Sequence, residues 1–200
     1  MAAPQTLLAL SGASLGPTPL SQAALVVIDA QNEYLDGRLP LQGIEAAVEE
    51  VARLLERARR LGRPILHVRH RGQPGGAFDP EARGGQIIEA VAPLADETIV
   101  EKTLPNAFAG TELMPQLARS GTKQLVVAGF MTHLCVSTSV RAAIDHRLFS
   151  TVVASACATR DLPSATSSEV MPARMLHEAT LAALADRFAV VVPDAGSLPD

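Results

Sequence analysis

The sequence predicts an α/β fold in which helices cover both faces of a mainly parallel, six-stranded sheet. Short runs of β-branched and apolar residues alternate along the chain with stretches whose apolar residues recur at helical spacing. Repeated units of this kind favour parallel strands joined by right-handed crossovers. The chain has 200 residues, of which 48% are hydrophobic, and this length and composition suit one domain with a sizeable core.

The strands are expected after an N-terminal arm over residues 1–22, which contains Pro4, Pro17 and Pro19. A single domain should then occupy residues 23–200. Its strands are expected in six short apolar runs, at residues 24–28, 64–68, 98–100, 124–128, 151–154 and 189–192.

One long helix is expected between the first two strands, where apolar residues mark a single face before Gly62. These residues are Ile44, Ala47, Val48, Val51, Leu54, Leu55 and Ala58. Further helices are expected at residues 111–119, 132–146 and 171–187, with a short helical turn near residues 87–91. Pro172 suits the first turn of the last helix. The loops at residues 34–42, 71–86 and 158–171 are expected to shape any binding pocket.

The charge of the chain argues against nucleic acid and membrane partners. The net charge is -4, and basic residues cluster only in short groups such as Arg59–Arg60 and Arg69–Arg71. No apolar run is long enough to cross a bilayer. No Lys or Arg precedes Arg38, so the positive start of a secretory signal is missing. We therefore expect a cytoplasmic protein in which Cys135 and Cys157 are reduced thiols and not a disulfide.

Cys135 lies where an apolar strand gives way to a helix, within the segment Gly129–Val136. The residues after it continue at helical spacing, which places the thiol at a helix N-terminus. Unpaired N–H groups and the positive end of the helix dipole favour a thiolate there, so we expect a depressed pKa for Cys135. The alternative is that Cys135 is one more small buried hydrophobic residue.

Two charged residues end other strand-like runs in the same way. Asp29 follows the run at residues 24–28, and Lys102 follows the run at residues 98–100. Ligands of open α/β sheets bind outside the carboxyl ends of the strands, so we expect Asp29, Lys102 and Cys135 to meet there. In such a site the carboxylate takes the thiol proton, while the ammonium orients the carboxylate and adds positive potential.

Three parts of the sequence resemble the cysteine hydrolases of the isochorismatase-like superfamily, which includes nicotinamidase-related amidohydrolases. They are Val27–Asn32, then Glu101–Lys102 with Asn106–Phe108 and Thr111–Leu113 behind it, and finally Gly129–Val136. They occur in the order and spacing of that family. The resemblance runs from about residue 24 to about residue 192.

The resemblance implies a Rossmann-like, three-layer α/β/α sandwich with Asp29, Lys102 and Cys135 as a catalytic triad. It also implies a cis peptide bond between Phe130 and Met131, which turns the N–H groups of Met131 and Cys135 toward one oxyanion. The reaction that it implies is hydrolysis of a carbon–nitrogen bond in a small amide or carbamoyl compound, through a thioester on Cys135.

No cofactor and no metal are expected. Nicotinamidases of the superfamily bind a divalent ion through an Asp and histidines in the region after the first strand. This sequence has no histidine between Asp36 and His67. His67 and His70 alone, three residues apart at a strand end, do not make a complete metal site.

Five residues are candidates for substrate binding: Gln31, Tyr34, His70, Phe108 and Thr132. Ordinary alternatives exist for several of them. Gln31 is of a type that also forms turns, Tyr34 suits a pocket wall or a surface loop, and a strand-end histidine such as His70 often packs or caps. Phe108 lies in a segment whose aromatic residue often lines the pocket in the family, which favours contact with substrate.

Three residues near these segments are expected to have other roles. Cys157 has no acid or base partner in view and is interpreted as structural. Arg160 either meets an anionic substrate or pairs with Asp161 in an exposed loop. His133 should point away from Cys135, because residues two apart on a helix are about 200° apart.

Three other functions stay open beside amide hydrolysis. Isochorismatases proper cleave a vinyl ether, but they lack the nucleophilic cysteine at the position of Cys135. A member of the fold that only binds a small molecule is another possibility, against which the intact triad argues. The third is a redox role for the thiol, for which no nearby resolving cysteine is present. The expected partner is a small-molecule substrate, and the resemblance implies a homo-oligomer, a dimer or a tetramer.

Overall fold

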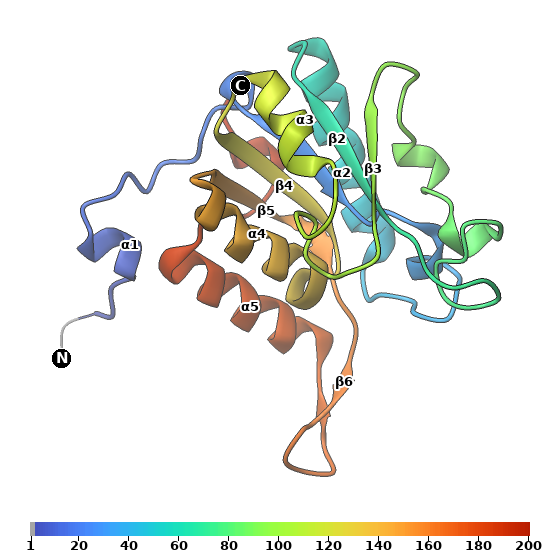
Figure 1. Cartoon of the computed structure of the whole chain (residues 1–200). Coiled ribbons are helices and arrows are strands. Elements are labelled where there is room, and N and C mark those ends of the chain that lie inside the picture. The colour runs from blue at the N-terminus through green and yellow to red at the C-terminus, as the bar shows by residue number, and fades with distance from the viewer. Residues whose placement is uncertain (1–2) are drawn as a thin grey trace.

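The computed structural model describes residues 3–200 and confirms the three-layer α/β/α fold (Figure 1). Its main sheet has six parallel strands in the order β3-β2-β1-β4-β5-β8. The strands are β1 (Ala24–Ile28), β2 (Ile65–His70), β3 (Thr98–Lys102), β4 (Gln124–Phe130), β5 (Phe149–Ala158) and β8 (Ala189–Val192). Because every strand runs the same way, all six carboxyl ends lie at one edge of the sheet.

Helices cover both faces of this sheet. Figure 1 shows α3 (Leu113–Ser120), α4 (Ser137–Ala143) and α5 (Ala173–Arg187) on one face, and α2 (Ile44–Arg60) on the other. Strand β1 lies in the middle and is buried along its whole length. Its side chains alternate between the two layers: Leu25 and Val27 pack toward α2, whereas Val26 and Ile28 pack toward the opposite helices.

Several predicted boundaries are wrong by a few residues, and two differences affect the site. Strands β2 and β3 extend to His70 and Lys102, so both side chains belong to strand ends and not to the loops that follow. The helix expected at residues 132–146 is divided into three parts. A π-helical turn (Thr132–Val136) precedes α4, and a single 3₁₀ turn (Ile144–His146) follows it.

The segment expected to be a loop at residues 158–171 contains a small hairpin. Its strands β6 (Leu162–Pro163) and β7 (Val170–Met171) are antiparallel and project from the body of the domain (Figure 1). Strand β5 is also longer than expected and continues to Ala158. Its pairing with β4 is irregular, because Val127 pairs with Val152 whereas Gly129 pairs with Cys157, so the extra residues lie on β5.

The N-terminal arm contacts the domain at several places. A short helix, α1 (Leu7–Leu10), lies beside α5, and the Leu7 N–H donates to Asp186 Oδ1 at 2.8 Å. Farther along, Leu20 is fully buried, and its N–H donates to the Pro199 carbonyl at 2.8 Å. The end of the arm therefore belongs to the core, next to the C-terminal residues.

Candidate active site

Three strands deliver Asp29, Lys102 and Cys135 to the same edge of the sheet. Asp29 follows β1, Lys102 is the last residue of β3, and Cys135 lies in the turn after β4. Strand β1 lies between β2 and β4 in the sheet, and β3 lies beyond β2. The side chain of Lys102 thus reaches across β2 toward the ends of β1 and β4.

The Lys102 ammonium joins the other two groups. Its Nζ lies 2.7 Å from Asp29 Oδ2 and 3.3 Å from Cys135 Sγ. The side chains of Asp29 and Lys102 have no solvent exposure, and Cys135 is 4% exposed. The structure therefore brings together the three residues of the expected triad in a buried position. Neither Asp29 oxygen accepts a well-aligned hydrogen bond from the described residues, so the ion pair is its main compensation.

The backbone around these residues has unusual conformations. Asp29 has a φ of +50°, in the left-handed region that residues other than glycine adopt rarely. Gly129 has a φ of +113°, and a side chain at this position would collide with the backbone of Ile28. The peptide bond between Phe130 and Met131 is cis, as the family resemblance implies.

The turn that carries Cys135 is bonded to the end of strand β5. The Thr132 hydroxyl donates to the Ala158 carbonyl at 3.1 Å, and His133 Nδ1 lies 2.6 Å from Thr159 Oγ1. His133 is therefore occupied by Thr159 and not by the thiol, in line with the prediction from helical spacing. These two bonds fix the position of the turn relative to the neighbouring strand.

Burial controls the protonation of the thiol, and the expected depressed pKa of Cys135 is wrong. Burial and the nearby Asp29 charge raise the pKa of Cys135 to about 12, although Lys102 acts in the opposite direction. Burial also raises the pKa of Asp29 above its ordinary value, against the effect of Lys102. The free protein therefore holds Cys135 as a neutral thiol, which requires a base to become a nucleophile.

His70 is the histidine that the structure brings to the triad. It is paired with Lys102 in the register of β2 and β3, and its Nδ1 lies 3.1 Å from Lys102 Nζ. Burial and the Lys102 charge lower the pKa of His70 to about 4, so the ring is neutral near pH 7. His67, in contrast, lies away from the triad, and its Nε2 is 2.8 Å from Glu97 Oε2.

Gln31 holds the backbone of His70 from the side. Its amide oxygen accepts the His70 N–H at 2.8 Å, and its nitrogen donates to the carbonyls of His70 and Gly85, both at 2.9 Å. Gln31 is fully buried, and these bonds occupy its amide group. These bonds position the backbone of His70 and Gly85. The contact of Gln31 with substrate stays a prediction.

The other candidates for substrate binding are Tyr34, Thr132 and Phe108, and each has different surroundings. Tyr34 is buried, which settles the choice against a surface loop, and its ring meets those of Phe78 and Phe130 edge to face. The Thr132 hydroxyl also lies 2.9 Å from His177 Nδ1. Phe108 is half-buried and packs on His146, with ring centroids 4.9 Å apart.

Arg160 is half-buried, whereas Cys157 is a core residue. Among the described residues, Arg160 does not form the expected ion pair: its guanidinium donates to the Asp161 carbonyl at 3.3 Å, and its Nε is buried without a partner. The Asp161 carboxylate instead accepts from the Ala173 N–H at the start of α5, at 2.7 Å. Cys157 is buried opposite Gly129 in the sheet, in agreement with its structural interpretation.

Comparison with known proteins identifies the family of this site. A family model described as the isochorismatase domain matches residues 23–195. The chain belongs to the isochorismatase family. A Bacillus subtilis relative, described as an uncharacterized isochorismatase family protein, is 40% identical over 84% of this chain and 94% of its own. A crystal structure of an isochorismatase from Pseudomonas putida KT2440 has a TM-score of 0.93, with 47% identity over 97% of this chain and 99% of that one.

Relatives of this isochorismatase-family protein include named hydrolases. Two proteins named streptothricin hydrolase, from Streptomyces noursei, are 32% identical over 88% of this chain and over 64% and 70% of their own lengths. A maleamate amidohydrolase from Pseudomonas putida is 35% identical over 67% of this chain and 70% of its own. The protein is a hydrolase of the isochorismatase family.

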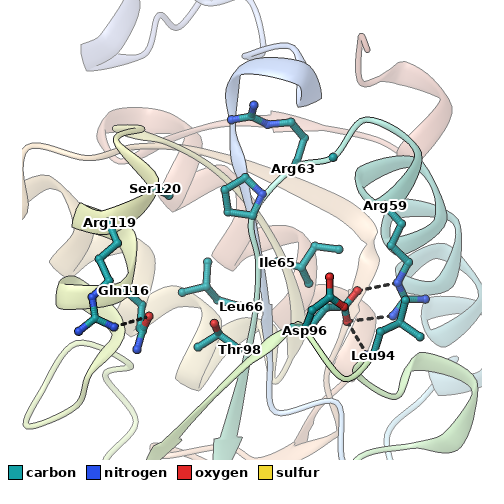
Figure 2. Close-up of a pocket in the computed structure, with 13 residues that line it drawn as sticks. Arg59, Arg63, Ile65, Leu66, Leu94, Asp96, Thr98, Gln116, Arg119 and Ser120 are labelled. Carbon is teal, nitrogen blue, oxygen red and sulfur yellow. Dashed lines mark hydrogen bonds and ion pairs between the residues drawn. The ribbon is translucent and has the colours of Figure 1, made fainter.

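A pocket of about 560 Å³ lies away from the triad, at the amino ends of β2 and β3 (Figure 2). Its wall includes Arg59, which is bonded to Glu97 at 2.7 Å, and Glu97 in turn contacts the buried His67. Figure 2 shows Arg63 and Arg119 on other sides of this pocket. None of the triad residues lines this pocket, so it is separate from the candidate active site.

A second pocket, of about 390 Å³, lies at the carboxyl end of β5. It is lined by Ala158, Thr159 and His177, which are the partners of Thr132 and His133, together with residues at the start of α2 and α5.

Within residues 3–200, no three His, Cys, Asp or Glu side chains are grouped so as to hold a metal ion. The described part of the chain also has no helix long and apolar enough to cross a membrane.

Proposed function

We propose that this protein hydrolyses a carbon–nitrogen bond of a small amide or carbamoyl compound, with Cys135 as the nucleophile. The observation that carries the proposal is the position of the Lys102 ammonium, which lies 2.7 Å from the Asp29 carboxylate and 3.3 Å from the Cys135 sulfur. An acid, an amine and a thiol in one buried site are the components that an activated nucleophile needs.

The first half of the reaction forms a thioester. The Cys135 sulfur attacks the carbonyl carbon of the amide, while the thiol proton passes to the Asp29 carboxylate. The raised pKa of Asp29 suits this step, because a base is most effective when its pKa approaches the working pH. As the carbon–nitrogen bond breaks, Asp29 returns the proton to the departing amine.

The oxyanion of the tetrahedral intermediate is assigned to the N–H groups of Met131 and Cys135. The neighbouring N–H groups of Leu134 and Val136 already donate to the Met131 carbonyl, at 3.0 and 3.3 Å, so they are not available to an oxyanion. Fixed N–H groups stabilise charge as it develops on the carbonyl oxygen, in a site from which water is largely excluded.

The second half releases the acid. A water molecule attacks the thioester carbonyl and transfers one proton to Asp29, and the carbon–sulfur bond then breaks. The proton held by Asp29 returns to the Cys135 sulfur, which restores the neutral thiol. Throughout both halves, Lys102 orients Asp29 and compensates the negative charge that moves between Asp29 and Cys135.

The relatives favour an amide over a vinyl ether as the substrate. Two of the matched proteins are named for hydrolase activity on streptothricin, and another is named maleamate amidohydrolase. A thiol forms a thioester by attacking a carbonyl carbon that carries a leaving group, as in an amide. The bond that breaks in a vinyl ether has no such carbonyl carbon. A homo-oligomer and a cytoplasmic location stay predictions, which light scattering and cell fractionation test.

The proposal is tested by a screen for ammonia release over small amides and carbamoyl compounds. Wild-type protein should release ammonia from at least one of them, and Cys135→Ala should not. Cys157→Ala is the matched control and should keep the activity, because Cys157 is buried opposite Gly129 and no triad residue is among the causes that shift its pKa. Intact-protein mass spectrometry after rapid acid quenching should show an acyl group on the wild type. Activity that survives in Cys135→Ala would contradict the proposal.

A further inference from the structure

The Lys102 ammonium has three protons and three neighbouring acceptors. Besides Asp29 Oδ2 at 2.7 Å and Cys135 Sγ at 3.3 Å, the third is His70 Nδ1 at 3.1 Å. An ammonium group has three donors and no acceptor, so this set satisfies it completely. Without His70, one proton of a fully buried ammonium would lose its partner.

This contact determines where the proton of His70 lies. A neutral imidazole has one N–H and one acceptor nitrogen, and Nδ1 must be the acceptor because it faces an ammonium. The proton therefore lies on Nε2. The Nε2 atom has no hydrogen-bond partner among residues 3–200 and is not among the fully buried atoms without partners, so it is at least partly accessible.

The ring is held in this orientation by its surroundings. The backbone of His70 is fixed by Gln31, with bonds to both its N–H and its carbonyl. On the other side, the ring meets Phe78 edge to face, with centroids 5.2 Å apart. His70 thus reaches from the buried ammonium to the accessible side of the site.

We propose that His70 has two roles: its Nδ1 accepts a hydrogen bond from the Lys102 ammonium, and its Nε2–H donates to a hydrogen-bond acceptor of the substrate. The substrates it favours are small amides that carry a second carbonyl or similar acceptor near the scissile bond. The recognition half of this inference rests on the proposed function, whereas the positioning of Lys102 is a property of the free protein.

The free protein supplies the first test, which needs no substrate. Long-range ¹H–¹⁵N NMR of the imidazole rings at pH 7 reports which nitrogen carries the proton, and His70→Asn assigns the signal among the five histidines. We expect the neutral Nε2–H form for His70. A proton on Nδ1, or a charged ring at pH 7, would overturn the proposal even if an amide substrate had been found.

The kinetics of two variants then distinguish the acceptor role of His70 Nδ1 from the donor role of His70 Nε2. His70→Asn retains an acceptor, Oδ1, near the position of Nδ1 but loses the Nε2–H donor. His70→Leu loses both. For an acceptor-bearing amide, we expect His70→Asn to raise KM about tenfold with kcat nearly unchanged, since one hydrogen bond is lost. We expect His70→Leu to lower kcat by about 100-fold, because Lys102 is no longer held in place.

The controls distinguish this role from a general effect on folding. Arg53 is exposed on α2 and pairs with Glu50, so Arg53→Leu should leave both kinetic constants unchanged. For an amide of the same length without a second acceptor, His70→Asn should match wild type in KM. Equal kcat in His70→Leu and wild type, or equal losses in His70→Asn and His70→Leu, would contradict the proposal. If the wild type hydrolyses no amide, the proposed function fails, while the NMR result still decides the position of the proton.

Discussion

The Asp29 carboxylate lies 2.7 Å from the Lys102 ammonium, and neither side chain has any exposure to solvent. Removing two charges from water costs free energy, which their attraction repays only with good geometry and further hydrogen bonds. Lys102 obtains these bonds from Cys135 and His70, whereas Asp29 obtains none that is well aligned. Asp29 is therefore the less stabilised charge of the pair, which is consistent with its raised pKa and with a task as base.

The first prediction is that Asp29→Asn makes Cys135 more reactive toward alkylation. The Asp29 charge is one of the causes that raise the pKa of Cys135, and Lys102 alone would favour a thiolate. Iodoacetamide at pH 7 should therefore label Cys135 several-fold faster in the variant than in wild type, although hydrolysis is lost. Peptide mapping measures the rate at each cysteine.

Cys157 is the internal control for this experiment. Burial raises its pKa to about 12 as well, but Asp29 is not among the causes. Its slow labelling should be the same in both proteins. Unchanged or slower labelling of Cys135 in Asp29→Asn would show that the carboxylate does not hold the thiol in its neutral form.

The second prediction concerns the acid side of the pH profile. Asp29 accepts a proton only when it is ionised, and burial raises its pKa above 3.8. Protonation of His70, whose pKa is about 4, would also place a proton against the Lys102 ammonium. We therefore expect kcat/KM to fall as pH decreases, through a pKa above that of an ordinary aspartate. A value of kcat/KM that stays level down to pH 4 would contradict the role of Asp29 as base.

The third prediction is that the hydrogen bonds of Glu97 with Arg59 and His67, at the amino end of the sheet, stabilise the folded protein. Hydrogen bonds from Arg59, Leu94 and His67 lower the pKa of Glu97 to about 2, against the effect of burial. The folded pKa is lower than the ordinary value of 4.5, so this stabilisation is complete above pH 4.5 and is lost as pH falls toward 2. Glu97→Gln should lower the free energy of unfolding at pH 7 by about 1.5–3 kcal/mol.

Urea unfolding at pH 7 and at lower pH measures this effect. The difference between wild type and Glu97→Gln should shrink between pH 4.5 and pH 2. Glu101→Gln is the matched control, since Glu101 pairs with Arg69 and Arg71 at the surface and is 39% exposed. It should change stability by less than about 1 kcal/mol. Equal losses in the two variants would contradict the importance of the buried network.

The positions of the triad residues followed from the sequence because they depend on simple features of the fold. Asp29, Lys102 and Cys135 each come at or just after the end of an apolar run, and the ends of parallel strands meet at one edge. The strands and helices that flank these residues could be predicted from the spacing of apolar residues. The two-residue strands of the β6–β7 hairpin were not, because no periodicity can be recognised over so short a length.

The environment of each group depended on tertiary structure. The prediction for the Cys135 thiol assumed the field of a helix N-terminus, but burial and the Asp29 charge have the larger effect. Similarly, the contact of His70 with Lys102 requires the exact register of β2 and β3, and the contact of His67 with Glu97 joins residues thirty positions apart. Neither register nor burial can be read from a single sequence with this precision.

The account is tested most directly by kcat/KM for wild type, Asp29→Asn, Lys102→Ala and the double variant, on any amide that the protein turns over. Each single change should reduce kcat/KM by about 100- to 10,000-fold, since it removes the base or the group that positions it. The double variant should lose little more kcat/KM than the less active of the two single variants, because the effects of residues that act as a unit are not additive. Fully additive losses, or near-normal activity in Asp29→Asn, would contradict a mechanism in which Asp29, Lys102 and Cys135 work together.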